Sequence, residues 1–274
     1  MLRFAFWNLN RKRLDDLVVD LVRQEKIDIL LLAEAPAGAG EVVHSLNRGV
    51  SVASDLFHAP LVPGGRSIIL FTRFLSDFAK LIRVSERITI REMHLPARQP
   101  FLLVAVHLPS KLYAKAEDQQ VEAGALASYI DQAETAVGHR RTVLVGDFNM
   151  NPFESGMVMA DGIHGVMTRS IALRRDRVLR GRKYPFFYNP MWNRFGDETP
   201  GPAGTYYYGN TGQVTHFWNM FDQVLIRPDL LAHFDSDRLR IVDRIGSKAL
   251  TTARGTPNKI LASDHLPILF ELNL

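Results

Sequence analysis

Apolar residues near the start of the chain follow first a strand pattern and then a helix pattern. Leu2, Phe4 and Phe6 alternate at period two, which predicts a first strand. Apolar residues at helical spacing follow over 14–22, with acidic residues in the first turn, as the helix dipole favours. The continuous apolar run over 27–34 indicates a strand that is buried on both faces. Together these three segments predict a parallel strand–helix–strand unit.

The same patterns predict further elements along the chain. We expect one long helix over 115–137, and strands over 67–72, 88–94, 101–107, 142–147, 221–226 and 266–272. Short loops link most of these elements, and no repeat or linker rich in Pro and Gly divides them. The sequence therefore predicts a single domain of helix-covered sheets over 1–274. An irregular insertion is expected over about 169–219.

The composition is that of an ordinary globular protein and excludes several other classes. Hydrophobic residues make up 46% of the chain and charged residues 23%, which excludes disorder and coiled coil. Every apolar run is too short to cross a bilayer, and the first residues do not form a signal peptide. The absence of cysteine excludes disulfides and thiolate chemistry. We expect a cytoplasmic protein without stable membrane insertion, and the sequence indicates no oligomeric state.

Positive charge is concentrated in one segment. Residues 169–183 contain seven Lys or Arg and one acid, whereas the whole chain has a formal net charge of +4. This favours contact with an anionic partner, with a solvated basic face as the alternative. If the segment contacts an anionic substrate, we expect Arg174 and Arg175 to bind it. Nearly half of the aromatic residues follow over 184–221, where they either stack on nucleobases or form a satellite core.

Polar residues gather where the predicted strands end, which is where sites form in sheet proteins. Each of them alone also fits a helix cap, a turn or a solvent-exposed strand end. Five offer oxygen ligands of the kind that Mg²⁺ or Mn²⁺ takes: Asn8, Glu34, Asp147, Asn149 and Asp264. Three more supply acid–base groups: His107, Asp222 and His265. A cation surrounded by such groups is suited to the attack of water on a phosphate ester.

Six motifs in series resemble the endonuclease/exonuclease/phosphatase superfamily, which includes pancreatic deoxyribonuclease, exonuclease III-type repair nucleases, neutral sphingomyelinases, inositol polyphosphate 5-phosphatases and deadenylases. The motifs are WN at 7–8, AE at 33–34, VHLPSK at 106–111, VGDFNMNP at 145–152, FDQVLI at 221–226 and SDHLPI at 263–268. The likeness spans residues 2–272. It implies an α/β fold, a four-layer, deoxyribonuclease I-like sandwich of two mixed β-sheets flanked by helices, with the site at one edge.

The resemblance also implies roles for the residues that meet a metal and water. Glu34 would bind the divalent cation, with Asn8 nearby, and Asp264 would reach the same region. Asp147 would orient or deprotonate the attacking water. Asn149 would hold a phosphoryl oxygen.

The remaining roles concern proton transfer and substrate contact. Asp222 would pair with His265 and fix its tautomer and charge. His107 would lie near the leaving group or a phosphate oxygen, at a position where repair nucleases usually carry Tyr. The histidine is more similar to the deoxyribonuclease and sphingomyelinase branches. A looser match places Arg66 where family members contact substrate phosphate, and a surface turn explains that residue equally well.

These observations favour a divalent-metal-dependent phosphodiesterase, a nuclease that hydrolyses DNA or RNA. The alternative is a phosphoesterase that acts on a lipid or small-molecule phosphate, although the basic segment contains no amphipathic helix that would favour a membrane surface. A third possibility is an inactive binding module. Such a protein is expected to lack metal-binding or acid–base residues, and this chain keeps every position that can be matched.

Overall fold

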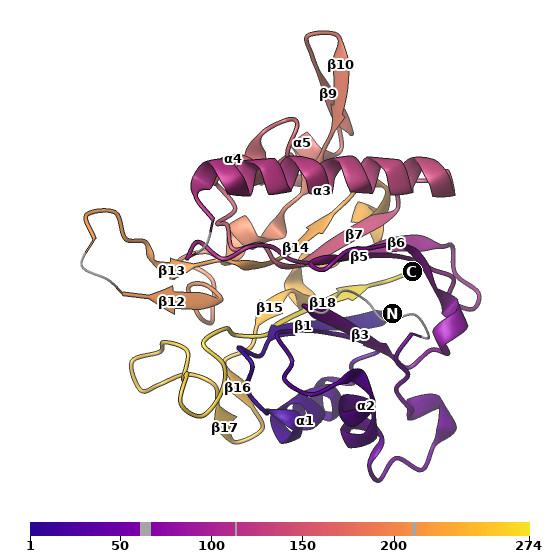
Figure 1. Cartoon of the computed structure of the whole chain (residues 1–274), viewed down its shortest axis with the longest axis vertical. Coiled ribbons are helices and arrows are strands. Elements are labelled where there is room, and N and C mark those ends of the chain that lie inside the picture. Colours follow the sequence, from indigo (N-terminus) through magenta and orange to yellow (C-terminus); the bar gives the residue numbers. More distant parts are fainter. Residues whose placement is uncertain (61–66, 113, 210–211) are drawn as a thin grey trace.

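Two β-sheets pack face to face, with helices on both outer faces (Figure 1). The structure is a computed structural model that describes residues 1–60, 67–112, 114–209 and 212–274. It has the mixed α/β sandwich architecture that the sequence predicts. The Arg66 prediction lies outside the described residues.

The first sheet has five strands and carries the N-terminus at its centre. Its order is β15 (Arg240–Ile241), β18 (Ile268–Leu272), β1 (Leu2–Asn8), β2 (Ile29–Ala33) and β3 (Ile68–Thr72). Strands β1 and β2 are parallel, as predicted, and Asn8 lies beside Ala33 at their carboxyl ends. The other neighbours in this sheet are antiparallel.

The second sheet has seven strands and contributes most of the polar strand ends. Its order is β4 (Ala79–Val84), β5 (Ile88–Met93), β6 (Phe101–His107), β7 (Thr142–Asp147), β14 (Asp222–Ile226), β11 (Phe187–Tyr188) and β8 (Gly165–Val166). Strands β6 and β7 are parallel, as are β8 and β11. The other pairs are antiparallel.

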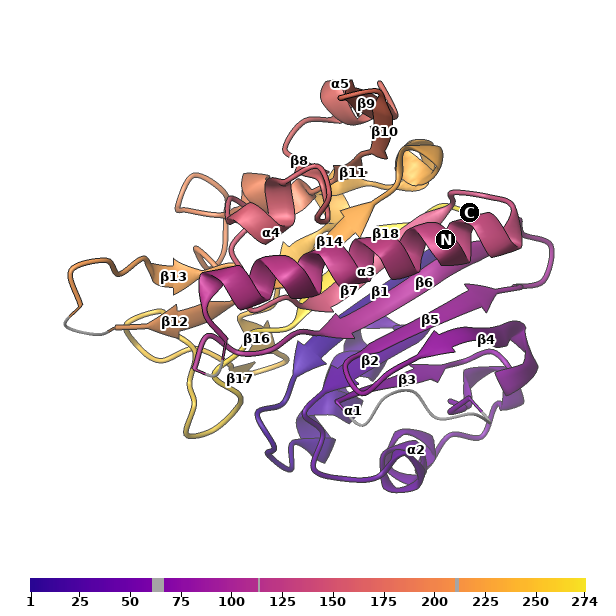
Figure 2. The same cartoon turned by 45° about the horizontal axis from the view of Figure 1, so that its top comes forward.

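Helices complete the outer layers. Helices α1 (Asp15–Glu25) and α2 (Ala39–Asn47) cover the five-stranded sheet, and α3 (Ala116–Val137) lies across the seven-stranded sheet (Figure 2). The short helices are α4 (Ser155–Val158), α5 (Arg169–Ala172), and the 3₁₀ turns η1 (Ala53–Asp55), η2 (Ser76–Phe78), η3 (Pro190–Arg194), η4 (Pro228–His233) and η5 (Ser236–Arg238).

Strand β6 shows why this arrangement buries both faces of the sheet. Alternate side chains point to opposite faces. Leu103 and Ala105 therefore belong to the core between the sheets, whereas Leu102, Val104 and Val106 pack beneath α3. The layers interlock at Phe4 of the first sheet, whose ring lies edge-on to Phe101 of the second at 6.3 Å.

Three pairs of strands stand apart from the two sheets. They are β9 (Asp176–Leu179) with β10 (Arg182–Pro185), β12 (Tyr206–Tyr208) with β13 (Phe217–Asn219), and β16 (Arg244–Ile245) with β17 (Lys248–Ala249). The β9–β10 and β12–β13 hairpins project from different parts of the molecule (Figure 1). Both lie within the segment that the sequence predicts to be irregular.

That segment differs from the expectation because its short strands pair with distant ones. β11 joins the seven-stranded sheet between β14 and β8. Consequently Phe186, Phe187 and Tyr188 are buried in the core and do not offer their faces to a ligand. Helix α2 and strand β4 are two further elements that the sequence pattern does not reveal.

Candidate active site

The carboxyl ends of the parallel strands bring the predicted residues of both sheets to one edge. In the seven-stranded sheet, Asp147 lies directly beside His107 on one side and Asp222 on the other. In the five-stranded sheet, Asn8 ends β1, and Glu34 follows the neighbouring strand β2. The fold therefore assembles residues that are far apart in the sequence.

Gly146 allows β6 and β7 to approach each other at this edge. A Cβ atom at this position would lie 1.9 Å from the carbonyl oxygen of Val106, which is closer than any side chain tolerates. Only glycine fits between the strands here. The close approach keeps His107 in register with Asp147.

The carboxylate of Asp147 is buried and held at both oxygens. The side-chain amide of Asn8 donates to Oδ2 at 3.0 Å, and the backbone N–H of Asn149 donates to Oδ1 at 2.9 Å. Asn149 is fixed in turn, because its side-chain amide donates to the carbonyl oxygen of Leu108 at 3.0 Å. These two hydrogen bonds keep the carboxylate in one orientation.

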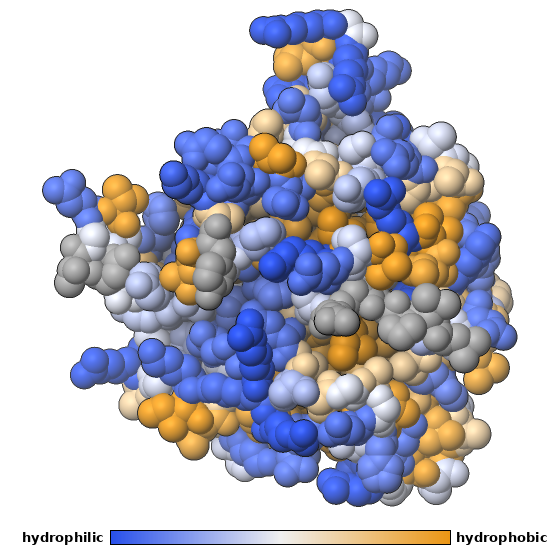
Figure 3. Space-filling model, in the orientation of Figure 1, coloured by the Kyte–Doolittle hydropathy of each residue, from blue (hydrophilic) through white to orange (hydrophobic). Residues whose placement is uncertain are grey.

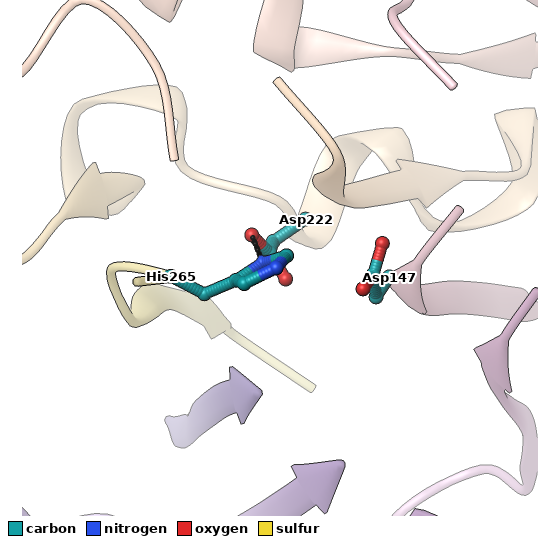
Figure 4. A group of neighbouring side chains, drawn as sticks. All are labelled: Asp147, Asp222 and His265. Atoms are coloured by element: carbon teal, nitrogen blue, oxygen red, sulfur yellow. Dashed lines mark hydrogen bonds and ion pairs between the residues drawn. The ribbon is translucent and has the colours of Figure 1, made fainter. Parts of the chain in front are cut away.

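Asp222 and His265 form the second feature of the site. Nδ1 of His265 lies 2.8 Å from Oδ2 of Asp222, and Figure 4 shows this pair facing Asp147. The hydrogen bond directs the other ring nitrogen, Nε2, away from Asp222. Oδ1 of Asp222 is buried without a hydrogen-bond partner.

Burial and charge act in opposite directions on this pair. Burial lowers the pKa of His265, but the charges of Asp222 and Asp147, with the hydrogen bond to Asp222, outweigh it and raise the pKa to about 10. Burial raises the pKa of Asp222, and His265 opposes that change. The pair therefore retains the imidazole proton at neutral pH.

Backbone and side-chain contacts hold the pair in place. The indole N–H of Trp7 donates to the carbonyl oxygen of His265 at 2.9 Å. The hydroxyl of Ser263 donates to the carbonyl oxygen of Asn8 at 2.7 Å and accepts from the N–H of His265 at 3.1 Å. The N–H of Asp222 donates to the hydroxyl of Thr205 at 3.1 Å. These contacts fasten the 263–265 loop to the end of β1.

Glu34 lies at the accessible side of the site, with 24% of its side chain exposed. Nε2 of His107 is 3.3 Å from one of its oxygens and 3.8 Å from Oδ2 of Asp147. Arg11 lies 3.4 Å from the other oxygen of Glu34. His107 therefore connects Glu34 with Asp147, while its buried Nδ1 has no hydrogen-bond partner.

Two site residues have left-handed backbones. Asn149 has φ 51°, which asparagine tolerates, whereas Glu34 has φ 48°, which is unfavourable for its side chain. Such strain persists where surrounding contacts determine the conformation, and it is concentrated at functional sites. Here it aims two polar side chains at the same edge.

The structure brings some predicted residues only to the margin of this site and others not at all. Asp264 lies at the margin, half-buried beside His265, and its Oδ1 lies 3.4 Å from the hydroxyl of Ser263. Arg174 and Arg175 lie elsewhere, next to the β9–β10 hairpin, and Arg175 forms an ion pair with Asp229. The two arginines therefore stand apart from the cluster around Asp147.

Sequence reasoning missed several residues that contact the site. Tyr206 places its ring 4.8 Å from that of His265, and burial together with the charge of Asp264 raises its pKa to about 12. Arg11 and Thr205 are the others. The run of three tyrosines over 206–208 was visible in the sequence, but nothing there linked it to His265.

The donor set fits a divalent cation. Among the described residues, Asp147, Asp222 and His265 have ligand atoms that all lie within 4.8 Å of one another, and because the imidazole keeps its proton, the carboxylate oxygens are the donors in this group. The unpartnered Oδ1 of Asp222 and the accessible carboxylate of Glu34 add oxygen donors of the kind that Mg²⁺ prefers.

No helix in the described part of the chain has the length and hydropathy needed to cross a membrane.

Comparisons with known proteins agree with this fold. The family described as "Endonuclease/Exonuclease/phosphatase family" matches residues 5–265, and the chain therefore belongs to it. It has the fold of this family of phosphoesterases. A search of curated proteins finds no match.

Similar solved structures include three that are aligned over almost their whole length. The endonuclease domain of TRAS1, a telomere-specific non-LTR retrotransposon, is 16% identical with a TM-score of 0.56, covering 100% of this chain and 99% of that one. The 3′ phosphatase NExo from Neisseria, bound to a product DNA hairpin, is 15% identical with a TM-score of 0.56, covering 100% of both chains. D. rerio TDP2, complexed with a single-strand DNA product, is 15% identical with a TM-score of 0.57, covering 100% of this chain and 99% of that one.

Proposed function

We propose that the protein is a divalent-metal-dependent phosphodiesterase that hydrolyses DNA or RNA. The observation that carries this proposal is the position of Asp147, fixed by Asn8 and Asn149 and facing the Asp222–His265 pair. A fixed carboxylate and a charged imidazole whose polar atoms lie within 4.8 Å of each other suit attack by water on a phosphodiester. The nucleic acids in the structures of NExo and TDP2 support this choice of substrate.

The residues divide the work according to their contacts. Asp147 orients the attacking water and accepts its proton. The Asp222–His265 pair presents Nε2–H to a phosphoryl oxygen, and Asn149 holds the phosphate. His107 positions Glu34 and lies beside the leaving oxygen. Glu34, with Asn8 and Asp264, would hold Mg²⁺ or Mn²⁺, which supplies a Lewis acid that offsets charge on the phosphate.

The substitution Glu34→Gln tests the metal requirement, because it removes one charge and keeps the shape of the side chain. We expect it to lower kcat/KM by about 100-fold or more at ordinary Mg²⁺, as loss of a preorganised charge does. Binding of Mn²⁺, measured by calorimetry, should weaken in the same variant. Glu198→Gln, an exposed residue outside the site, is the matched control. Full activity of Glu34→Gln, or of the unaltered protein in chelator, contradicts the mechanism.

A second candidate is hydrolysis of the phosphodiester of a lipid. It is favoured by Ile260 and Leu261, which are 87% and 70% exposed in the loop before Ser263. A panel of single- and double-stranded DNA, RNA, inositol phosphates and sphingomyelin vesicles, each with Mg²⁺, Mn²⁺ or chelator, separates the two functions. Turnover of vesicles without turnover of nucleic acid overturns the first proposal in favour of the second.

A further inference from the structure

The β12–β13 hairpin is fixed to the candidate site by both of its strands. Tyr206 forms a backbone bridge with His265, and its ring stacks on Phe221 at 5.3 Å. Asn219, at the end of the opposite strand, accepts a hydrogen bond at 2.9 Å from Asn151, which lies in the loop after Asp147. The base of the hairpin is therefore positioned by three segments that also position the site.

The outer part of this hairpin is aromatic and exposed. Tyr208 and Phe217 are paired across the strands, and each is 50% exposed. Tyr207 contacts Trp218 at 5.4 Å and Phe217 at 6.4 Å between ring centroids. Where Figure 1 places this hairpin, Figure 3 shows isolated orange side chains among pale and blue ones, projecting from the body of the molecule.

The backbone of Phe217 is strained in a way that its packing does not require. Its φ of 58° is left-handed, which is unfavourable for a bulky side chain. The side chain is nevertheless half exposed, so little of its surface is buried in return. Strain that holds an aromatic ring in solvent beside an active site indicates a contact that the isolated chain lacks.

The hairpin has no charge to attract a phosphate backbone. Residues 206–219 contain no Lys, Arg, Asp or Glu. In an intact duplex the faces of the bases are hidden in the stack, so an uncharged aromatic surface gains little from it. Unpaired bases expose these faces, and aromatic side chains stack on them without regard to sequence.

We propose that the β12–β13 hairpin is a stacking platform for unpaired nucleobases next to the scissile phosphate. The substrate is then single-stranded or locally unpaired nucleic acid. Tyr208 and Phe217 supply the platform, and Tyr206 connects it to His265. This inference rests on the proposed nuclease function and narrows its substrate class.

The experiment compares two single-stranded oligonucleotides that differ only in whether the nucleotides flanking the cleaved bond carry bases. The variants are Tyr208→Ala and Phe217→Asn, because Asn tolerates the left-handed backbone. The unaltered protein should have a KM about tenfold or more lower for the oligonucleotide with bases than for the abasic one. In either variant the ratio of the KM for the abasic oligonucleotide to the KM for the oligonucleotide with bases should fall towards one. Tyr208→Phe keeps an aromatic ring and should keep the ratio of the unaltered protein. Val121→Ala, exposed on α3 and outside both hairpins, is the control.

Binding of the same oligonucleotides, followed by fluorescence anisotropy in chelator, gives a readout that does not need turnover. An equal loss of affinity for both oligonucleotides overturns the inference, because the hairpin then does not contact bases. Binding to anionic phospholipid vesicles is measured in parallel. If the variants lose affinity for these vesicles and not for the oligonucleotides, the inference is also overturned, and the hairpin is a membrane contact. If the unaltered protein binds with base dependence but never cleaves, the nuclease function fails while the platform stands.

Discussion

Asp147 shows at the scale of one residue how the fold prepares a group for chemistry. Both of its oxygens accept a hydrogen bond, and its two strand neighbours are the other candidate acid–base residues. Because the carboxylate is already desolvated and oriented, the proposed deprotonation of a water molecule would need little reorganisation. A side chain on a loose surface loop lacks this advantage.

The Asp222–His265 pair predicts a strongly non-additive mutant cycle. Each of the substitutions His265→Ala and Asp222→Asn should lower kcat by about 100-fold or more, as loss of an acid–base group does. The double variant should be little worse than His265→Ala, because the aspartate acts through the imidazole. Steady-state kinetics on one oligonucleotide measures all four proteins. Multiplicative losses show instead that the two residues act independently.

His164, which directly precedes β8, predicts how stability depends on pH. It is 3% exposed, and Nδ1 lies 3.2 Å from the carbonyl oxygen of Pro185. Burial, and then the charge of Arg177, lower its pKa to about 4. Since the folded pKa is below the ordinary value, its contribution to stability is complete above about pH 6.5 and is lost as the pH falls to about 4.

The free energy of unfolding should therefore decrease by up to about 3 kcal/mol across that interval because of this residue. In His164→Asn, which tolerates the left-handed φ of 57°, the decrease should be smaller. Urea unfolding at several pH values measures both proteins. His44→Gln, at an exposed position on α2, is the control. Parallel curves for the original protein and His164→Asn refute the assignment.

Sequence reasoning found those site residues that end regular strands and missed those that arrive by irregular turns. Asn8 and Asp147 follow buried runs, so their position at a sheet edge was predictable. Arg11 reaches Glu34 because Asn10 and Arg11 have φ values of 48° and 57°, which turn the chain back. No periodic pattern encodes that turn.

At the scale of elements, the strength of a pattern depends on its length. The helix expected over 115–137 forms as α3, and the strand expected over 101–107 forms as β6. Strands of two residues, such as β8 and β11, have no measurable period, and partners that are distant in sequence hold them in place. The fold class was therefore predictable, and the order of the edge strands was not.

The aromatic residues over 184–221 show a further limit of prediction from sequence patterns. Around β11 its rings fill the core, and Phe187 lies under the guanidinium of Arg227 at 3.8 Å. Around β12 and β13 its rings are exposed near the site. Composition alone does not separate these two populations, since both are equally aromatic. Only the pairing of β11 with β14 shows which rings the sheet buries.

At the scale of the whole molecule, the two hairpins differ in charge and lie at different ends of β14. The β12–β13 hairpin is linked to Asp222 at the start of that strand. Arg227, just beyond its other end, donates to the carbonyl oxygens of Pro185 and Phe186 at the base of the β9–β10 hairpin. A strand of this length separates the two bases by about 15 Å.

The basic segment over 169–183, which includes most of the β9–β10 hairpin, should therefore contact only substrates long enough to reach it from the site. Arg174, Arg177, Arg180 and Lys183 are exposed, whereas Arg169 binds carbonyl oxygens of the fold and Arg175 pairs with Asp229.

Replacing those four exposed cations by Gln should raise KM for a nucleic acid of about 30 nucleotides and flatten the fall of affinity with salt, because fewer counterions are released on binding. An oligonucleotide of about four nucleotides spans too little of the surface to reach the hairpin, so its KM should not change. Turnover at saturation should stay similar for both. KM measured between 50 and 200 mM salt for each length tests whether the segment contacts only long substrates.

Equal losses on long and short substrates, with the fold intact by circular dichroism, assign the segment to the site itself. No loss on either means that its charge is a solvated face, and then the uncharged platform beside His265 is left to select the substrate.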